Sequence, residues 1–559
     1  MFQLEFKNCV KLFNSGNILD SKNEAELLLK KYPDNFELNK FLGVLFFYTN
    51  NLIKAKIFFN KCLDINPESP DIYFNLGLVF KKDGQLDIAK KNYEAAINLD
   101  ENFLKAYINL GVVLEEQSKY FDAIETLDLA LKRDNKNYAI YSNRGILFQK
   151  IKKFEDSVAS FIEAIRINNT DSEPFYNLAI TYKKMGDFDN AIINYKKAIS
   201  LKPNHYRAYN NLGSLFVDLR KFSEALECFK KSLEINNEFL EAYYNESFIF
   251  LLQNQFIEGW KRYENRWCAK GEEKPLYDLN NNLWDGKFLE GTLLVWSEQG
   301  IGDHIFFGRI VKTLKDSAKN VIFVVDKRLV DLFKNFFLKS GINNISVIKL
   351  IKNDSQIKFD KHIPAASLPR YFAKNDNDIL KFSKNIFIID RNDNKKLNNF
   401  LKNLPGFKIG LSWRSLNNNE QHRSIPLKDF NSILKTNNCS FVNLQFGNID
   451  EELNQTQKNL GIKIYDLKEI DKTNDINELS FLIKNLDLII TIQNTTAHLS
   501  LGFQKKTFVL LPTNSRWQWG VNSKTSVWYP SAQLFRQTRF NYWEDVLNNV
   551  KNELNKLLI

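Results

Sequence analysis

The chain has 559 residues, 44% of them hydrophobic and 26% charged, with only 12 Pro and 22 Gly, which excludes a disordered or collagen-like polypeptide. Of its 77 basic and 66 acidic residues, 37 and 36 lie within residues 1–270, so nearly all of the net charge of +11 belongs to the second half. This asymmetry predicts a local anionic ligand and not nucleic acid, for which no recognition motif accompanies the charge.

Cysteine usage and the apolar segments indicate the compartment. Cys9, Cys62, Cys228, Cys268 and Cys439 are widely spaced and form no CxxC pair, which excludes a disulfide framework and a zinc cluster. The sequence has no run of about 18 apolar residues, and its first ten residues lack the basic and apolar segments of a signal peptide. We therefore expect a cytoplasmic protein with no membrane span.

Residues 1–270 repeat with a period of 34. The segments YFNLG, YINLG, YSNRG, FYNLA and YNNLG begin at residues 73, 107, 141, 175 and 209, and the period extends to about eight units. These units start near residues 2, 36, 70, 104, 138, 172, 206 and 240. Self-similarity at such a period is typical of helical repeat proteins.

Small residues occupy the eighth and twentieth positions of each unit, which allows two antiparallel helices to cross closely. The eighth position holds Cys9, Gly43, Gly77, Gly111, Gly145, Ala179, Gly213 and Ser247. Large residues fill the eleventh and twenty-fourth positions. The last unit departs from the pattern at Trp260, Arg266 and Trp267, which predicts a cap onto the following region. Together these features resemble the tetratricopeptide repeat.

The sixth position of the units is polar without a packing reason. It holds Asn75, Asn109, Asn143, Asn177, Asn211 and Asn245. The resemblance to superhelical repeat arrays of protein glycosyltransferases implies an asparagine ladder in the concave groove, which holds an extended polypeptide because Asn both donates and accepts. The alternative is that each Asn bonds locally and stabilises its own helical turn. The array thus predicts a polypeptide partner or self-association into a homo-oligomer.

Strands alternate with helices after a polar, turn-rich linker at residues 271–290. In the first block, residues 291–400, we expect strands at 292–296, 321–325 and 345–350, helices at about 303–315 and 327–339, and loops at Pro364, Pro369 and 375–378. In the second block, residues 401–559, we expect strands at 408–413, 441–446, 463–467, 487–492 and 507–511, with helices from about 495 and at about 542–558. Two such blocks predict two Rossmann-like sheets.

A glycine loop, EQGIGD at residues 298–303, follows the first expected strand. Gly300 and Gly302 allow the backbone to approach a ligand closely. Asp303 stands at the start of the next helix, where it is either a functional carboxylate or only a helix cap.

A second candidate site, TIQNTTAHL at residues 491–499, follows the strongest strand of the second block. Asn494, Thr495 and Thr496 offer hydroxyl groups, caps and backbone N–H groups at a helix N-terminus, which predicts phosphate binding. His498 lies one turn further along and reaches the same ligand, unless it is a structural histidine.

The second half resembles the GT-B glycosyltransferases that follow tetratricopeptide repeats in bacteria, which are related to heptosyltransferases (glycosyltransferase family 9) and distantly to protein O-GlcNAc transferases. The resemblance rests on LWDG (283–286), EQGIGD (298–303), GLSWRS (410–415), HRSIPL (422–427), FVNLQ (441–445), NTTAHL (494–499), RWQWG (516–520) and WYPSAQLFRQ (528–537). It implies an all-α repeat superhelix followed by a GT-B fold, with the acceptor facing the first sheet and a nucleotide-sugar bound by the second.

By this resemblance Asp303 is the general base that takes the acceptor proton. The residues implied to hold the donor phosphates are Arg414, Arg423, Asn494, Thr495, Thr496 and His498. Each arginine is alternatively a surface ion pair, and Gln445 and Trp519 are further candidates near the nucleotide. The resemblance implies no metal and no cofactor besides the nucleotide-sugar substrate, because GT-B enzymes stabilise the leaving phosphate with helix dipoles and basic residues.

Two residues depart from the family pattern. Gln493 replaces the Asp that usually precedes the Asn–Thr segment, and His304 follows Asp303 where relatives often have Thr. The expected function is transfer of a sugar from a nucleotide-sugar to an acceptor that the repeats recruit. The alternative, which Gln493 supports, is a non-catalytic repeat scaffold with a degenerate nucleotide-binding domain.

Overall fold

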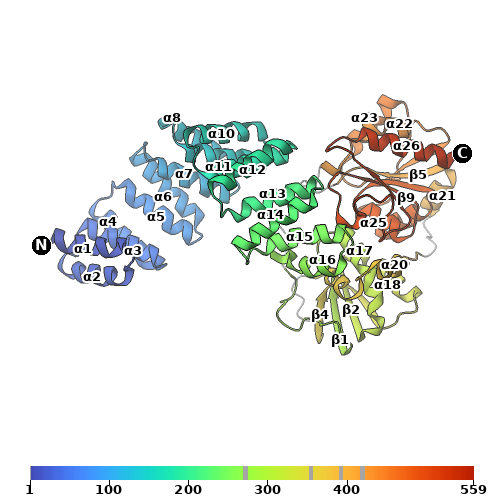
Figure 1. Ribbon diagram of the computed structural model, residues 1–559, viewed down its shortest axis with the longest axis horizontal. Helices are drawn as coiled ribbons and strands as arrows, with labels where there is room; N and C mark the ends of the chain where they lie inside the picture. The colour runs from blue at the N-terminus through green and yellow to red at the C-terminus, as the bar shows by residue number, and fades with distance from the viewer. Residues whose placement is uncertain (1, 269–274, 352–356, 385, 390–394, 416–421) are drawn as a thin grey trace. The chain divides into compact units, whose positions relative to one another are not determined.

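The computed structural model describes residues 2–268, 275–351, 357–384, 386–389, 395–415 and 422–559 (Figure 1). The chain forms two compact units, residues 1–211 and residues 212–559. This division falls inside a repeat helix, so the last repeats belong to the same compact unit as the α/β region.

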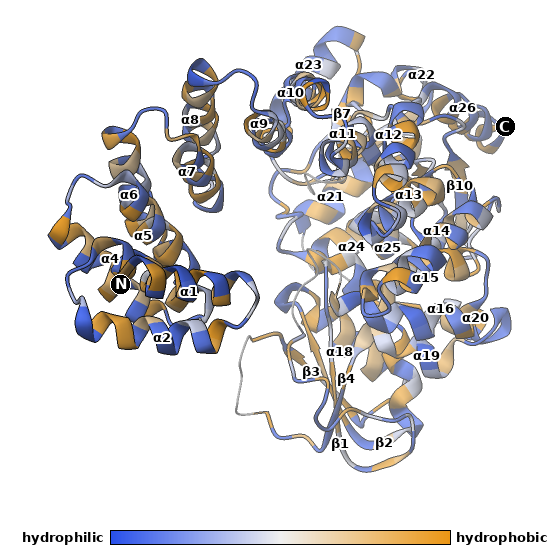
Figure 2. Cartoon of the chain, turned by 60° about the vertical axis from the view of Figure 1, so that its left-hand side comes forward, coloured by the Kyte–Doolittle hydropathy of each residue, from blue (hydrophilic) through white to orange (hydrophobic). Residues whose placement is uncertain are grey.

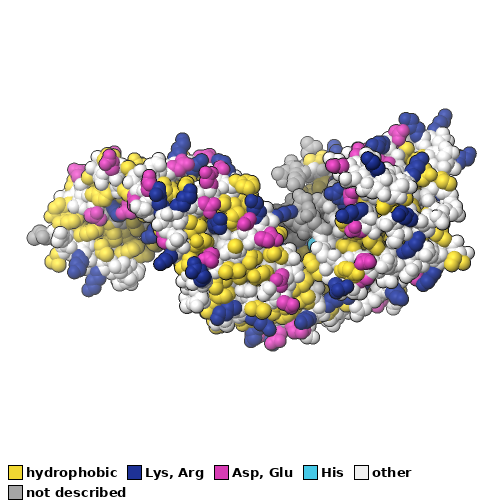
Figure 3. Space-filling model, turned by 90° about the horizontal axis from the view of Figure 1, so that it is seen from above, with side chains coloured by type: hydrophobic (Ala, Val, Ile, Leu, Met, Phe, Trp, Pro, Cys, Tyr) yellow, Lys and Arg dark blue, Asp and Glu magenta, His cyan; other side chains and the backbone are white. Residues whose placement is uncertain are grey.

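The first unit is built, over its described residues, from antiparallel helix pairs, two helices for each 34-residue repeat. The helices are α1 (Phe2–Asn14), α2 (Ile18–Lys31), α3 (Phe36–Tyr48), α4 (Leu52–Ile65), α5 (Pro70–Lys82), α6 (Leu86–Leu99), α7 (Leu104–Glu116), α8 (Tyr120–Arg133), α9 (Tyr138–Lys150), α10 (Phe154–Ile167), α11 (Ser172–Met185), α12 (Phe188–Leu201) and α13 (Tyr206–Asp218), which continues into the second unit. Each helix carries both hydrophobic and hydrophilic residues (Figure 2), as expected of amphipathic repeat helices. Basic and acidic side chains are interspersed over the N-terminal helices in Figure 3.

The expected close crossing of paired helices is confirmed. A Cβ atom added to Gly43 would lie 2.6 Å from the ring of Phe59, and one added to Gly145 would lie 2.7 Å from the ring of Phe161. The small residues at the twentieth position are also completely buried: Ser21, Ala55, Ala89, Ala123, Ser157, Ala191 and Ala225 are 0% exposed. The glycine at the eighth position therefore makes room for the large side chain at the twenty-fourth.

The last repeats of the array pack onto the α/β region within the second unit. They form α14 (Phe222–Ile235), α15 (Leu240–Leu252), α16 (Phe256–Tyr263) and the 3-10 helix η1 (Glu264–Cys268). Trp260 is 1% exposed, donates a hydrogen bond to the carbonyl of Ala373 at 3.0 Å and packs edge-on against Trp517. The predicted cap is therefore confirmed.

The first sheet is parallel, with the strand order β3-β2-β1-β4. Its elements are β1 (Leu289–Trp296), α17 (Ile301–Gly308), η2 (Ile310–Asp316), β2 (Ala318–Val325), η3 (Lys327–Leu329), α18 (Val330–Lys339), β3 (Ile345–Lys349), β4 (Lys361–Pro364), η4 (Ala365–Ser367), α19 (Pro369–Phe372), α20 (Asp376–Ser383) and α21 (Lys395–Asn403). The strand order changes direction between β1 and β4, so a ligand crevice is expected there.

The second sheet is also parallel, with the order β10-β9-β8-β5-β6-β7. Its elements are β5 (Phe407–Ser412), η6 (Leu427–Phe430), α22 (Asn431–Leu434), β6 (Cys439–Asn443), α23 (Asp450–Leu460), β7 (Ile464–Tyr465), α24 (Ile476–Lys484), β8 (Leu488–Ile492), α25 (Thr495–Gly502), β9 (Thr507–Leu511), η7 (Trp517–Trp519), β10 (Ala532–Arg536) and α26 (Glu544–Leu558). This is the Rossmann order, with its switch point between β5 and β8. The expected fold class, a repeat superhelix followed by Rossmann-like sheets, is confirmed.

Some local expectations are wrong. Pro364 and Pro369, both expected in loops, lie in regular elements. Pro364 ends the edge strand β4 and Pro369 begins the helix α19, and neither position requires the backbone N–H that proline lacks. Residues 375–378, expected in a loop, start α20, because the Asn375 side chain accepts a hydrogen bond from the Asp378 amide. The helix expected at 303–315 divides at Arg309, whose buried guanidinium donates to the carbonyl of Phe382 at 2.9 Å.

Candidate functional site

A cavity of about 940 Å³ lies in the second unit at the carboxyl ends of β5 and β8. Its walls come from the glycine turn after β1, residues 414–415 and 422–423 after β5, the start of α25, the segment 513–521 after β9, and the repeat helices α13 to α15. The predicted residues in these walls are Asn245, Gly300, Gly302, Asp303, Arg414, Arg423, Asn494, Thr495, His498 and Trp519. The fold thus brings both sequence motifs to one cavity at a switch point, where open α/β sheets bind ligands.

Asp303 lies in the first turn of α17, with only 8% of its surface exposed. Its Oδ1 atom is 3.4 Å from Nη1 of Arg516, on the segment that follows β9. The suggestion that Asp303 only caps this helix is wrong, because the N-cap residue is Gly300. The carboxylate instead faces the cavity beside a cation.

The two glycines of the turn have different roles. A Cβ atom on Gly302 would lie 3.0 Å from Cδ2 of His498, so this glycine allows α17 to pack closely against α25. A Cβ atom on Gly300 would lie 3.8 Å from Oδ2 of Asp303, an ordinary contact, and Gly300 lines the cavity. Gly302 therefore has a packing role against His498, and its role toward a ligand stays a prediction.

The start of α25 is held by its own side chains. Asn494 is the N-cap and its Oδ1 accepts from the Ala497 amide, while its Nδ2 donates to Oγ of Ser412 at 2.8 Å. Thr496 is 1% exposed and donates to the same Ser412 hydroxyl. Both side chains therefore fix the loop to β5, and the predicted anion site narrows to Thr495 and the backbone N–H groups of the first turn.

His498 is neutral at physiological pH. It is 8% exposed, and burial, together with the nearby Arg516 and Arg309 charges, lowers its pKa to about 3. Its Nδ1 atom lies 2.9 Å from the Tyr529 hydroxyl, and its ring lies against that of Trp519. A phosphate contact from His498 is therefore a neutral hydrogen bond and not an ion pair. Burial also lowers the pKa of His304, to about 4.

Two further candidates, Arg414 and Gln445, contact residues of or near the loop after β5. Arg414 lines the cavity but pairs with Glu452 at 3.4 Å, as the surface alternative suggested. Gln445 is 1% exposed, and its Oε1 accepts from the backbone amides of Trp413 and Arg414. Gln445 therefore shapes this loop and is not among the residues that line the cavity.

Sequence reasoning missed Arg516 and the role of Gln493. Gln493 is 7% exposed, and its Oε1 accepts the backbone N–H of Arg516 at 3.2 Å. It therefore holds the segment that brings Arg516 to Asp303. The signal that could have found Arg516 is its position after β9, in the RWQWG motif.

Two of the sixth-position asparagines, Asn109 and Asn143, show the local bonding that was the alternative to a ladder. Nδ2 of Asn109 donates to the Lys105 carbonyl at 2.9 Å, and that of Asn143 donates to Ala139 at 3.0 Å. An Asn side chain has two N–H groups and an acceptor oxygen, so one local bond leaves capacity for a ligand. Asn211 differs, since it donates to the Tyr176 hydroxyl.

The described residues contain neither a cluster of metal-ligating side chains nor a helix suited to span a membrane. Within them, no three His, Cys, Asp or Glu side chains gather as a metal site would require. In the same part of the chain, no helix has the length and apolar character needed to cross a bilayer.

Comparison with known proteins supports the repeat assignment. Residues 41–69, 58–91 and 170–238 match tetratricopeptide repeat families. The protein FlbA of Caulobacter vibrioides is 27% identical over 313 residues, which cover 53% of this chain and 52% of FlbA. The chain thus spans about half the length of this relative.

Three solved structures are similar to part of the chain. MamA is 28% identical, with 29% of this chain and 95% of MamA covered and a TM-score of 0.27. YrrB, described as a TPR protein with an unusual peptide-binding site, is 22% identical, with 33% and 96% covered and a TM-score of 0.28. A tetratricopeptide repeat protein from Parabacteroides merdae is 16% identical, with 44% and 97% covered and a TM-score of 0.38.

Proposed function

We propose that the chain is a GT-B glycosyltransferase that transfers a sugar from a nucleotide-sugar to an acceptor, which we expect to be a polypeptide recruited by the repeats. One observation carries this proposal. A single cavity holds the Asp303 carboxylate from the first sheet and the N-terminus of α25 from the second. A proton acceptor and an anion site at one switch point are what this transfer needs.

In the proposed reaction Asp303 accepts the proton of an acceptor hydroxyl, whose oxygen attacks the anomeric carbon. The bond from that carbon to the diphosphate oxygen breaks, and the electron pair leaves with the diphosphate. The first-turn N–H groups of α25 and the Arg516 guanidinium stabilise the departing negative charge. Neutral His498 contributes a hydrogen bond from the same wall.

The first test asks whether the cavity binds a donor. A thermal-shift panel of nucleoside diphosphates and nucleotide-sugars is expected to stabilise the chain with one nucleotide class, because ligands that bind the folded state raise the unfolding temperature. If none of them stabilises the chain, the donor site is wrong and the non-catalytic scaffold is favoured.

The second test concerns the base. Asp303→Asn is expected to lower transfer by about 10²- to 10⁴-fold, the usual contribution of general base catalysis, while donor binding is retained. The matched control is Asp376→Asn, since Asp376 is also an acid in the first turn of a helix beside the first sheet but is exposed. Transfer by Asp303→Asn at the rate of the control would disprove the assignment.

A further inference from the structure

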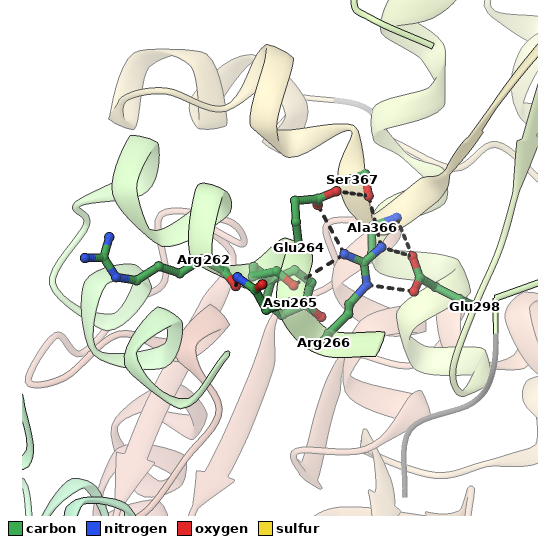
Figure 4. Close-up of polar contacts among 8 residues, drawn as sticks. Arg262, Glu264, Asn265, Arg266, Glu298, Ala366 and Ser367 are labelled. Carbon is green, nitrogen blue, oxygen red and sulfur yellow. Dashed lines mark hydrogen bonds and ion pairs between the residues drawn. The ribbon is translucent and has the colours of Figure 1, made fainter. Parts of the chain in front are cut away.

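The switch point of the first sheet is filled by the protein itself. The chain leaving β1 reaches Glu298, and the chain leaving β4 reaches Ala366 and Ser367, so these residues flank the place where such a sheet would bind a ligand. The Arg266 side chain, from η1 at the end of the repeat array, enters between them (Figure 4).

Arg266 makes a bidentate ion pair in this crevice. Its Nε lies 2.8 Å from Oε2 of Glu298, and its Nη2 lies 2.7 Å from Oε1. Nη2 also donates to the Ser367 hydroxyl at 3.0 Å, and Nη1 donates to Glu264 at 3.1 Å. Oε1 of Glu298 accepts a further hydrogen bond from the Ala366 amide at 3.3 Å.

Both charged side chains are shielded from solvent, with 1% of Arg266 and 3% of Glu298 exposed. The many hydrogen bonds hold this buried ion pair in one geometry. Removing either partner would leave an uncompensated buried charge, which is strongly destabilising. The planar fork of arginine matches both carboxylate oxygens in one fixed geometry and leaves further N–H groups for the hydroxyl, which the compact ammonium of lysine does not reproduce. The cluster is therefore a rigid joint between η1 and both strand ends.

Glu298 is the residue that starts the functional turn. Gln299 follows it with a φ angle of 64°, a left-handed conformation that is unusual for a residue with a side chain. Gly300 then caps α17, which carries Asp303 in its first turn. A turn with such a conformation persists only when its surroundings fix it. The Arg266–Glu298 pair anchors the turn at the residue directly before Gln299.

We infer that Arg266 is a positioning residue: it holds Glu298 and thereby places the Asp303 carboxylate in the cavity. This inference rests on the proposed function of Asp303. It also means that the end of the repeat array is part of the catalytic unit and that the first sheet has no ligand crevice of its own. Misplacement of a reacting group by about 1 Å lowers rates by about 100-fold, so the joint has a measurable consequence.

The test uses the full chain with Arg266→Lys, which keeps the charge and loses the fork. The matched control is Arg262→Lys, because Arg262 lies one helical turn earlier, pairs with Glu246 and Glu258, and does not enter the crevice. We expect Arg266→Lys to lower kcat by about 10- to 100-fold while the KM for the nucleotide-sugar identified in the panel stays within about twofold. The control is expected to leave both unchanged.

Hydrogen exchange without ligand gives a second readout that does not depend on activity. The amides of residues 299–303 are expected to exchange faster in Arg266→Lys than in Arg262→Lys. If Arg266→Lys fails to fold, Glu298→Gln removes the charge at nearly constant shape and takes its place. Equal kcat and equal exchange in the Arg266 and Arg262 variants would overturn the inference. Absence of transfer by the wild-type chain would refute the proposed function. The hydrogen exchange of residues 299–303 in the two variants would then test by itself whether Arg266 holds the turn.

Discussion

Burial makes His498 a source of pH-dependent stability. Its pKa is lowered to about 3 in the folded chain and is about 6.5 in an unfolded chain. The unfolded state therefore binds one proton more between these two values. The stabilising contribution is fully present above pH 6.5 and is lost progressively as the pH falls towards 3, by about 1.4 kcal/mol per pH unit.

We predict that His498→Gln flattens the pH dependence of unfolding. Between pH 7 and pH 5 the wild-type chain is expected to lose about 2 kcal/mol more stability than the variant, because glutamine does not titrate. Urea unfolding followed by tryptophan fluorescence measures this specifically, since all nine tryptophans lie in the second unit. Parallel stability curves for the two proteins would contradict the buried, neutral state of His498.

The candidate site was predictable where local chemistry defines a residue and not where folding brings distant residues together. The glycine turn pointed to Asp303, and the strand–Asn–Thr pattern pointed to the start of α25. The pattern does not reveal that the Asn494 amide is used by the cap and by Ser412, since that depends on β5 lying beside β8. Arg516 is separated from Asp303 by 213 positions, so their contact exists only in the folded chain.

At the scale of helices and strands, two strands were not predicted from the sequence, β4 and β10. β4 contains Lys361, His362 and Pro364, which give no apolar run, and it is a strand because it pairs with β1 at the sheet edge. β10 is another edge strand and pairs with β9. The strongly apolar β8 and β9, which are buried at every position, were predictable within about one residue.

The glycine at the eighth repeat position provides a prediction about a helix pair. Gly145→Ala is expected to destabilise the first unit by about 1–2 kcal/mol, because overpacking against the ring of Phe161 outweighs the better helix propensity of alanine. Phe161 is 0% exposed and the added Cβ atom would lie 2.7 Å from its ring. Unfolding followed by far-ultraviolet circular dichroism measures the effect, since the first unit has no tryptophan.

The control occupies the same position one repeat earlier. A Cβ atom on Gly111 would lie 3.2 Å from Cδ2 of Leu127, the end of a flexible side chain. Gly111→Ala is therefore expected to be close to neutral, because its propensity gain offsets a smaller clash. Equal destabilisation by the two substitutions would show that the aromatic at the twenty-fourth position is not what requires glycine.

At the scale of the whole molecule, the distribution of charge differs between the region proposed to bind the donor and the array proposed to bind a polypeptide. The basic excess lies beyond residue 270, with the cavity proposed for an anionic donor, whereas the array is nearly balanced in charge. A balanced array that holds a polypeptide does so through neutral groups. The sixth-position asparagines are neutral groups that recur along it, and two of them, Asn109 and Asn143, also have a local bond within their own helix.

Asparagines on the second helices of the repeats provide a control that distinguishes polypeptide binding from local hydrogen bonding. Asn92 and Asn194, on the second helices of their repeats, donate to the carbonyl one turn earlier at 2.8 Å, as Asn109 and Asn143 do from the first helices. Loss of the local bond is therefore the same in the double variant Asn109→Ala/Asn143→Ala and in the control Asn92→Ala/Asn194→Ala. Any difference between the two variants in binding belongs to the face of the array that carries the sixth position.

We predict that Asn109→Ala/Asn143→Ala weakens binding of an unstructured, fluorescently labelled polypeptide by about tenfold or more, since each lost hydrogen bond contributes about 1 kcal/mol. Two peptides with different side chains are expected to lose affinity equally, because the ladder contacts the backbone. Fluorescence anisotropy measures the affinities, and thermal unfolding checks that both variants fold.

Nucleotide binding in the second unit is expected to stay unchanged. If the control double variant loses as much peptide affinity, the asparagines act only within their own helices and the ladder is wrong.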